Sequence, residues 1–285
     1  MRAQATCFGA GTLVNAIATR KGAAFGLALR ATAVAESLPR AEGVRVQVAG
    51  SVDPTLAMGC VQRVLRRSRR RAGLAVRVDS EIPVSRGLKS SSAVANAVVL
   101  ASARALGLEL EPLQIIGIGI EAALEAKVTV TGAFDDACAS FFGGIVVTDN
   151  AAREIVKADR FPGDLMAVLH IPKRAIPKPS LAAKDFSSIR PQVEEAYRLA
   201  LRGEYFRALE RNSAAYAPIL EVDESPARRA RAAGAVAAGI TGAGPAILAL
   251  AKPAHVESVA RALDDGEAEV RVASLNTVES REVAP

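Results

Sequence analysis

Three consecutive serines follow a glycine and a lysine in the segment Gly87-Leu-Lys-Ser-Ser-Ser92. An extended apolar run ends at Pro83, and the Ala/Val-rich residues 93–105 have the composition of a helix. The first N–H groups of a helix have no internal partners and the helix dipole is positive there, so donors for an anion gather at this turn. One serine would be enough to cap the helix. We therefore predict that residues 85–92 bind a polyphosphate.

Two adjacent carboxylates, Asp135 and Asp136, lie in a polar turn predicted over residues 129–136, and a Gly-Gly pair follows at 143–144. Their flanks are apolar, and carboxylates in such surroundings are partly buried and need a cation or a donor. Solvated turn acids are the alternative interpretation. Upstream, Glu121 and Glu125 are four residues apart on one face of a predicted helix. Taken alone, the two residues are explained as part of a charged surface stripe.

A second glycine-rich segment, Gly-Ile-Thr-Gly-Ala-Gly-Pro at residues 239–245, comes before an apolar strand. Its three glycines allow positive φ and close approach of another backbone. A glycine turn between a helix and a strand is common, so this segment alone is a weak indication of a phosphate nearby.

The serine turn is not a Walker A loop, because that motif needs a second glycine. It resembles the Pro-x-x-x-Gly-Leu-x-Ser-Ser-x-Ala signature of the GHMP kinases, and the matching residues are Pro83, Gly87, Leu88, Ser90, Ser91 and Ala93. Most members have glycine in place of Lys89, and Gly-Leu-Lys-Ser-Ser-Ser is similar to the archaeal branch that phosphorylates shikimate. The resemblance covers the whole chain, with residues 239–245 in the position of the family's third motif.

The resemblance implies a kinase that uses ATP and Mg²⁺ to convert shikimate to shikimate 3-phosphate, in the pathway to aromatic amino acids. It implies that Ser91 and Glu125 hold the Mg²⁺ and that one of the two aspartates is the catalytic base. Matching Ile-Asp-Asn of the family favours Asp135, which we prefer, whereas counting back from Gly143 favours Asp136. The residues expected to bind the nucleotide are Pro83, Arg86, Gly87, Leu88, Lys89, Ser90, Ser91, Ser92, Ala93, Thr241, Gly242, Ala243 and Gly244.

Residues 9–17 resemble the first family motif only loosely. Thr12 stands where mevalonate kinase has a lysine that assists the reacting hydroxyl. Lys21 is a candidate replacement, although an exposed turn charge explains it equally well, and Asn15 is a candidate contact of the substrate. A shikimate carboxylate would also need a cationic partner, for which an arginine fork is best suited.

Apolar periodicity places these motifs on an α+β framework. In the first part it predicts strands at 16–19, 23–29, 43–48, 74–78 and 145–147, and helices at 54–72, 93–106 and 112–127. After a linker at 159–163 it predicts strands at 165–171, 246–251 and 270–274, a loop at 173–179, and helices at 192–202, 205–217, 227–238 and 254–263. The second part suggests a ferredoxin-like α+β sandwich. With the resemblance, we expect the two-domain GHMP kinase fold: an N-terminal α/β domain with a left-handed crossover (residues 1–158) and a C-terminal ferredoxin-like domain (residues 159–285).

The 285 residues are half hydrophobic, which is enough for two domains, and carry a formal net charge of +6. Much of the excess is a run of arginines at helical spacing with apolar residues, formed by Arg63, Arg66, Arg67, Arg69, Arg70 and Arg71. No aromatic residues interleave with them for base stacking, so a solvated helix face is favoured over a nucleic-acid site. The three cysteines, Cys7, Cys60 and Cys138, are scattered and receive no function.

No apolar run is long enough to span a membrane and no signal peptide is recognised, so a cytoplasmic protein is expected. The partner expected is a small-molecule substrate, with no nucleic acid and no membrane, and a homodimer is one compatible assembly. The alternatives are the same chemistry on homoserine or mevalonate, and a non-catalytic ligand-binding sensor of the same fold. Such a sensor would be expected to have lost its acid, whereas this chain has both Asp135 and Asp136.

Overall fold

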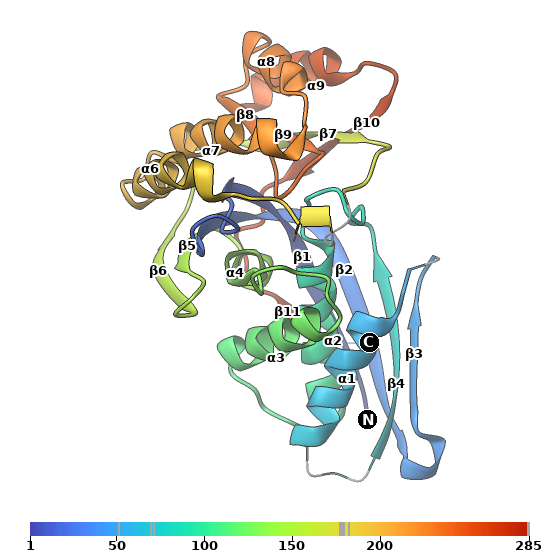
Figure 1. The fold of residues 1–285 in the computed structure, drawn as a ribbon. Helices are drawn as coiled ribbons and strands as arrows, with labels where there is room; N and C mark the ends of the chain where they lie inside the picture. Colours follow the sequence, from blue (N-terminus) through green and yellow to red (C-terminus); the bar gives the residue numbers. More distant parts are fainter. Residues whose placement is uncertain (51, 69, 71, 177–179, 182, 284–285) are drawn as a thin grey trace.

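Two β-sheets, each covered by helices, organise the chain (Figure 1). The computed structural model describes residues 1–50, 52–68, 70, 72–176, 180–181 and 183–283. The first sheet has the order β11-β1-β2-β4-β3, with β5 paired to the start of β2 and β6 paired to β5. Its strands are β1 (Arg2–Val14), β2 (Lys21–Pro39), β3 (Val44–Val48), β4 (Ala72–Ser80), β5 (Ile145–Asp149), β6 (Glu154–Asp159) and β11 (Arg281–Val283).

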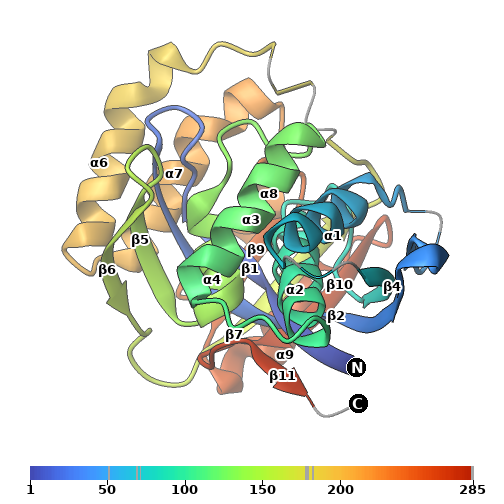
Figure 2. The same ribbon diagram turned by 90° about the horizontal axis from the view of Figure 1, so that it is seen from below.

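Four helices lie on one face of the first sheet (Figures 1 and 2). They are α1 (Thr55–Arg67), α2 (Ser90–Ala105), α3 (Pro112–Glu125) and α4 (Phe134–Phe142). In the first half of β1, Ala3, Ala5 and Cys7 face these helices and are buried, while the residues between them are more exposed, which is the two-residue alternation of a strand. Strands β3 and β4 are parallel, and α1 makes the crossover between them.

The second sheet is antiparallel and has the order β10-β7-β9-β8. Numbered along the chain within this sheet, the order is 4-1-3-2, the ferredoxin-like arrangement that the sequence predicted. Its strands are β7 (Met166–Pro172), β8 (Ala237–Ile240), β9 (Ile247–Ala251) and β10 (Ala268–Ser274), and its helices are α6 (Arg190–Leu201), α7 (Tyr205–Leu220), α8 (Ser225–Ala232) and α9 (Val256–Leu263). Short 3₁₀ turns occur at Arg40–Glu42, Ser187–Ile189 and Pro253–His255.

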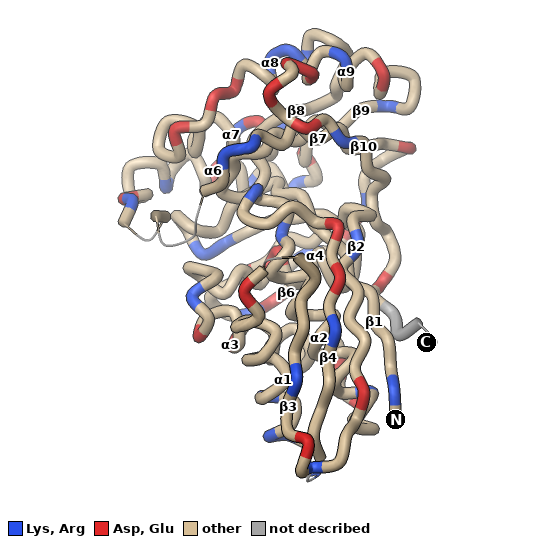
Figure 3. The backbone as a smooth tube through the Cα atoms, turned by 90° about the vertical axis from the view of Figure 1, so that its right-hand side faces the viewer, with Lys and Arg blue, Asp and Glu red and all other residues tan. Residues whose placement is uncertain are grey.

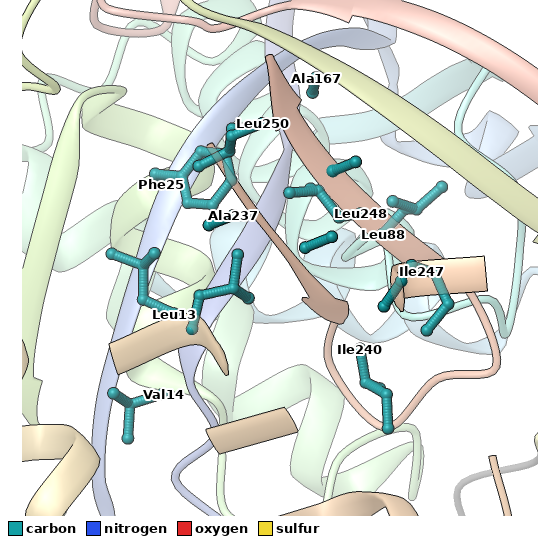
Figure 4. Close-up of a cluster of buried hydrophobic side chains, with 14 of the residues drawn as sticks. Leu13, Val14, Phe25, Leu88, Ala167, Ala237, Ile240, Ile247, Leu248 and Leu250 are labelled. Atoms are coloured by element: carbon teal, nitrogen blue, oxygen red, sulfur yellow. The ribbon is translucent and has the colours of Figure 1, made fainter. Parts of the chain in front are cut away.

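One hydrophobic cluster is shared by the two sheets, and a second lies between the first sheet and its helices. Leu13 and Phe25 of the first sheet lie close to Leu248 and Leu250 of the second (Figure 4). Leu88 belongs to the cluster that the two sheets share and is fully buried. It anchors residues 85–92, here called the serine segment, beside β9. The serine segment therefore lies where the two sheets meet.

The strand prediction near the N-terminus was wrong. Residues 16–19 form a turn, and the strand is β1, which ends at Val14. The second half of β1 is buried on both faces, between helices and the second sheet, so it lacks the alternation by which a strand is recognised. The helix predicted over 54–72 ends at Arg67, and β4 begins at Ala72.

Several boundaries also differ in and around the helices. Helix α2 begins at Ser90, three residues before its predicted start, and α4 replaces the end of the turn predicted over 129–136. Helix α7 continues past Pro218, and the helix predicted over 227–238 is α8 followed by β8. Strand β8 was missed because its four residues, Ala-Ala-Gly-Ile, carry no periodicity, and β6 was not predicted.

The end of the chain returns to the first sheet, where β11 pairs with β1. The division into domains at residue 159 stays a proposal, with β11 packing outside the sheet formed by the rest of the second part. Arg69 and Arg71 of the predicted arginine face, and residues 177–179 of the predicted loop, lie outside the described residues. Figure 3 shows basic and acidic residues interspersed along both halves of the backbone. Over the described ranges, no helix combines the length and the apolar character that a membrane crossing requires.

Candidate active site

The serine segment follows β4, turns sharply at Lys89 and ends in the first turn of α2. Lys89 is the residue before α2 and has left-handed backbone angles, with φ 65° and ψ 31°. Ser90, Ser91 and Ser92 form the first turn of the helix, so their N–H groups are among those without a carbonyl partner inside the helix. The prediction of donors gathered at a helix N-terminus therefore agrees with the backbone geometry.

The glycine turn after β8 packs directly against this segment. The Thr241 hydroxyl donates a hydrogen bond to the carbonyl oxygen of Gly87, at 3.1 Å. A Cβ atom on Gly87 would lie only 2.1 Å from the carbonyl oxygen of Thr241. The contact between the two segments thus depends on glycine at position 87.

Residues of the first motif hold the same glycine turn from the other side. The side-chain amide of Asn15 donates to the carbonyl oxygen of Gly242 at 2.8 Å, and the Gly242 N–H donates to the Thr12 hydroxyl at 2.9 Å. Thr12 N–H in turn donates to the Thr241 hydroxyl at 3.2 Å. Three segments that are far apart in the sequence therefore form one hydrogen-bonded unit.

The two aspartates lie in the first turn of α4, and each has a different neighbour. Asp136 Oδ1 is 2.8 Å from the Lys89 ammonium nitrogen, and the lysine side chain is only 7% exposed. Asp135 Oδ1 accepts a hydrogen bond from the side-chain amide of Asn150 at 2.7 Å. The Thr148 hydroxyl donates to Asn150 Oδ1, also at 2.7 Å, which fixes the amide so that its N–H group faces Asp135. Both carboxylates are buried, as their apolar flanks predicted.

Burial raises the pKa of Asp135 well above its usual range, and the neighbouring charge of Asp136 raises it further. The Lys89 ammonium and the hydrogen bond from Asn150 oppose this rise. A carboxyl group with a raised pKa, in a buried site that also contains a cation, is suited to accept a proton from a hydroxyl group.

Two cavities meet at the Lys89–Asp136 pair. The larger has a volume of about 390 Å³ and is lined by the serine segment on one side and by residues 126–129 with the end of α3 on the other. The smaller, of about 30 Å³, is bounded by Asp135 and by the segment 129–131. Both are lined by Lys89, Thr129, Ala133 and Asp136.

Most of the predicted nucleotide residues reach these cavities. The larger one is lined by Pro83, Gly87, Leu88, Lys89, Ser90, Ser91 and Ser92, and the smaller one by Gly242, Ala243 and the predicted substrate residue Asn15. Ala93, Thr241 and Gly244 do not line either cavity. Ala93 is buried in the core, and Thr241 holds the glycine turn against Gly87.

Three predicted site residues point elsewhere. The Arg86 guanidinium donates to the carbonyl oxygens of Pro172 and Val84 and so ties the loop to the end of β7. The Lys21 ammonium lies over the ring of Tyr197, 5.7 Å from its centroid. The Glu125 carboxylate is 2.5 Å from the Arg63 guanidinium, with its side chain 69% exposed. None of the three lines either cavity.

The structure also reveals site residues that were not predicted. Asn150 and Gly22 both contact Asp135, and a Cβ atom on Gly22 would lie 2.4 Å from Asp135 Oδ2. Neither has a local sequence signal, because each reaches Asp135 of α4 from a different part of the fold. Lys89 is the one cation among the described residues that line the smaller cavity, so no arginine fork is present there for a carboxylate.

Two family models match the chain. "GHMP kinases N terminal domain" matches residues 55–144 and "GHMP kinases C terminal" matches residues 178–268. The chain is 45% identical over 250 residues to the shikimate kinase of Methanothrix thermoacetophila, covering 88% of this chain and 85% of the relative. It is 40% identical over 257 residues to the shikimate kinase of Pyrococcus furiosus, covering 89% and 93%.

Solved structures share the fold at low sequence identity. The homoserine kinase of Cytophaga hutchinsonii superposes with a TM-score of 0.80 at 16% identity, covering 99% of this chain and 97% of that one. The mevalonate kinase of Methanococcus jannaschii gives a TM-score of 0.76 at 13% identity, covering 97% and 98%. At these identities, the likeness shows a shared fold alone.

Proposed function

The chain belongs to the GHMP kinase family, and we propose that it transfers the γ-phosphoryl group of ATP to shikimate, giving shikimate 3-phosphate. The observation that carries this proposal is the identity of 40–45% to shikimate kinases along nearly the whole chain. The site supports it, because a cavity at a helix N-terminus adjoins a buried acid pair.

The two cavities suggest a division of the substrates. The larger one has the volume of a typical ligand cleft and offers the N–H groups and hydroxyls of residues 90–92, which suit a triphosphate. The smaller one contains both aspartates and would take the acceptor alcohol. The γ-phosphorus would then lie near the Lys89–Asp136 pair, where the cavities meet.

In the proposed transfer, the shikimate hydroxyl oxygen forms a bond to the γ-phosphorus while the bond from phosphorus to the β–γ bridging oxygen breaks. ADP leaves, and the hydroxyl proton passes to an aspartate. We favour Asp135 as the acceptor, because its raised pKa brings it closer to the operating pH than an ordinary carboxylate. The rest of catalysis is positioning and neutralisation of charge.

For Mg²⁺ we propose Ser91 and Glu125 as protein ligands. Ser91 lines the larger cavity and fits this role, whereas Glu125 would first have to leave Arg63. Among the described residues, no cluster of three or more His, Cys, Asp or Glu side chains could hold a metal ion. One hydroxyl and one carboxylate are enough for Mg²⁺, which is commonly bound by one or two protein groups together with phosphates and water. When bound, Mg²⁺ would neutralise charge on the β- and γ-phosphates.

Shikimate binding requires the smaller cavity to widen. Its volume of about 30 Å³ is far below the roughly 300–1,000 Å³ of ligand clefts. The segment 129–131 lines it and lies outside the helices and strands, between α3 and α4. Connecting segments of this kind move more readily than the elements they join, so this is the wall we expect to move.

The test is to measure kcat/KM for shikimate, homoserine and mevalonate at saturating ATP and Mg²⁺, with ³¹P NMR to identify the product. A site that pairs the polar groups of one alcohol can reject another by up to about 10⁴-fold, because its own polar groups are left unpaired. We expect shikimate to be preferred by at least about 10²-fold, a conservative part of that range. Equal or better use of either other alcohol would refute the substrate assignment.

A further inference from the structure

We propose that Lys89 is a catalytic residue that acts on the phosphoryl group in transit, and that Asp136 holds its ammonium group at the junction of the two cavities. This inference rests on the proposed function and deepens it. It gives the two aspartates different tasks, with Asp136 positioning the lysine and Asp135 accepting the proton.

The backbone directs Lys89 to this place. A residue that continued α2 would have right-handed angles, whereas Lys89 has φ 65° and ψ 31°. Its side chain is 7% exposed and reaches α4, and its ammonium nitrogen would lie 3.0 Å from a Cβ atom on Gly242. Glycine at position 242 therefore leaves the space that the ammonium group occupies.

The ammonium group retains hydrogen-bonding capacity for a ligand. Lysine has three donors and no acceptor. The pairing with Asp136 Oδ1 at 2.8 Å is the one polar contact that the described residues make with this group. The ammonium group therefore has donors left for oxygens of a ligand, at the point where the same side chain lines both cavities.

The environments of the two carboxylates separate their tasks. Asp136 lines both cavities and is paired with the lysine, whereas Asp135 lines only the smaller cavity and receives the Asn150 amide. The proton acceptor must lie with the alcohol, and the cation must lie between the alcohol and the nucleotide. Asp135 and Lys89 satisfy these two conditions.

Lys127 provides the contrasting lysine, since it lines only the larger cavity. We would compare Lys89→Met with Lys127→Met by measuring kcat with shikimate, and by titrating a non-hydrolysable ATP analogue to obtain its Kd. We expect Lys89→Met to lower kcat by about 10²-fold or more, as removal of an oxyanion donor does, with Kd changed by less than about fivefold. Lys127→Met should mainly raise Kd. Lys89→Arg should recover only part of kcat, because a planar fork does not replace a point charge.

A double-mutant cycle tests the role of Asp136. If Asp136 acts through Lys89, the pair Lys89→Met and Asp136→Asn should cost little more than Lys89→Met alone. A pH profile gives a separate readout. The Lys89 charge lowers the pKa of Asp135, so its loss should move the acid limb of kcat/KM to higher pH. The other titratable neighbours of Asp135, which are Asp136, Cys138 and Tyr216, remain in place in this variant.

The results distinguish the two proposals. If the wild-type enzyme phosphorylates shikimate but Lys89→Met weakens analogue binding as much as it lowers kcat, Lys89 is only a nucleotide-binding charge and this inference is wrong. Additive costs in the cycle would separate Asp136 from Lys89. If the wild-type enzyme does not phosphorylate shikimate, the proposed function fails instead, and the analogue titration, which needs no shikimate, shows whether the nucleotide site stands.

Discussion

Two neighbouring aspartates are the proposed acid and base groups of the site, and their surroundings differ because a helix turns successive side chains by about 100°. Asp135 faces β2 and Asn150, whereas Asp136 faces Lys89. The same residue type is thereby placed in two electrostatic settings within one turn of α4. Pairs of acids separated in this way are how a protein assigns different acid and base tasks.

The kinetic prediction at this scale concerns the two carboxylates. Asp135→Asn removes the proposed proton acceptor, so kcat should fall by about 10²-fold or more while ATP affinity stays within a few-fold. Steady-state kinetics with shikimate, together with nucleotide titration, check this. Wild-type turnover in Asp135→Asn would transfer the role of the base to Asp136 or remove it from both.

The pH dependence follows from the pKa of Asp135, which burial raises from 3.8 to about 7. Below that pH the carboxyl group is protonated and cannot accept a proton, so kcat/KM should decline on the acid side of neutral. The folded protein also binds this proton more tightly than the unfolded chain, so stability should fall as pH rises from about 4 to about 7. Asp135→Asn should remove that fall, and its gain in Tm over the wild type should be larger at pH 8 than at pH 5.

At the scale of elements, α4 depends on the close approach of β2. A Cβ atom on Gly22 would lie 2.4 Å from Asp135 Oδ2 and 2.6 Å from its Cγ, nearer than real Cβ atoms come. Asp135 cannot yield freely, because Asn150 holds its other oxygen and the helix holds its backbone. Glycine at position 22 therefore belongs to the site although it has no reactive group.

We predict that Gly22→Ala will displace Asp135, lower kcat and destabilise the protein by roughly 1–3 kcal/mol, the usual cost of overpacking. Gly117→Ala in α3 is the matched control, since nothing lies within 4 Å of the added carbon. That control should keep its activity and gain up to about 1 kcal/mol from helix propensity. Thermal unfolding and turnover of both variants test this, and an active, stable Gly22→Ala protein would contradict the packing argument.

Helices α1 and α3 are joined by the ion pair between Arg63 and Glu125, which competes with the proposed metal role of Glu125. An exposed pair of this kind contributes about 0.2–1 kcal/mol. Arg63→Met should therefore lower the free Mg²⁺ needed for half-maximal activity, by no more than about fivefold, while Glu125→Gln should raise it. Rates measured against free Mg²⁺ at fixed ATP decide this. Unchanged Mg²⁺ dependence in both variants would remove Glu125 from the metal site.

At the scale of the whole molecule, the site exists only where the two sheets meet. The serine segment comes from the first sheet, the glycine turn from the second, and Leu88 and Leu248 share one core beneath them (Figure 4). The chain then returns to the first sheet: Asn276 exchanges backbone hydrogen bonds with Gly26 and Gly144, and the Ser280 N–H donates to the carbonyl oxygen of Phe141. These contacts fasten the two parts to each other.

Truncation after Leu275 should therefore destabilise both parts together. It removes the three backbone hydrogen bonds that Asn276 and Ser280 make with the first sheet and α4, at about 1 kcal/mol each, and it uncovers the edge of β1. We expect the free energy of unfolding to fall by at least about 3 kcal/mol, in a single cooperative transition. Urea unfolding followed by two probes, one in each part, measures this. If only the second part lost stability, the prediction that these contacts stabilise both parts would be wrong.

The sequence alone determined the features that depend on local chemistry. The serine segment, its family, the acid pair and most of the helices followed from residue type and spacing, because capping, glycine backbone freedom and helical periodicity act over a few residues. The ferredoxin-like second part was recognised even though β8 was missed, since the order of its elements already restricts the topology.

Only the tertiary structure decided which charges meet. Lys89 was predicted to serve the nucleotide and Lys21 was a candidate to replace a missing lysine, yet it is Lys89 that reaches Asp136, while Lys21 lies over Tyr197. Arg86 and Glu125 found partners at Pro172 and Arg63. Side chains that look equivalent in a sequence are separated by the directions in which the folded backbone points them. The left-handed turn at Lys89 directs its ammonium group toward Gly242, and the absence of a side chain at Gly242 leaves room for that group. The two residues are far apart in the sequence, so neither effect could be predicted from local residues.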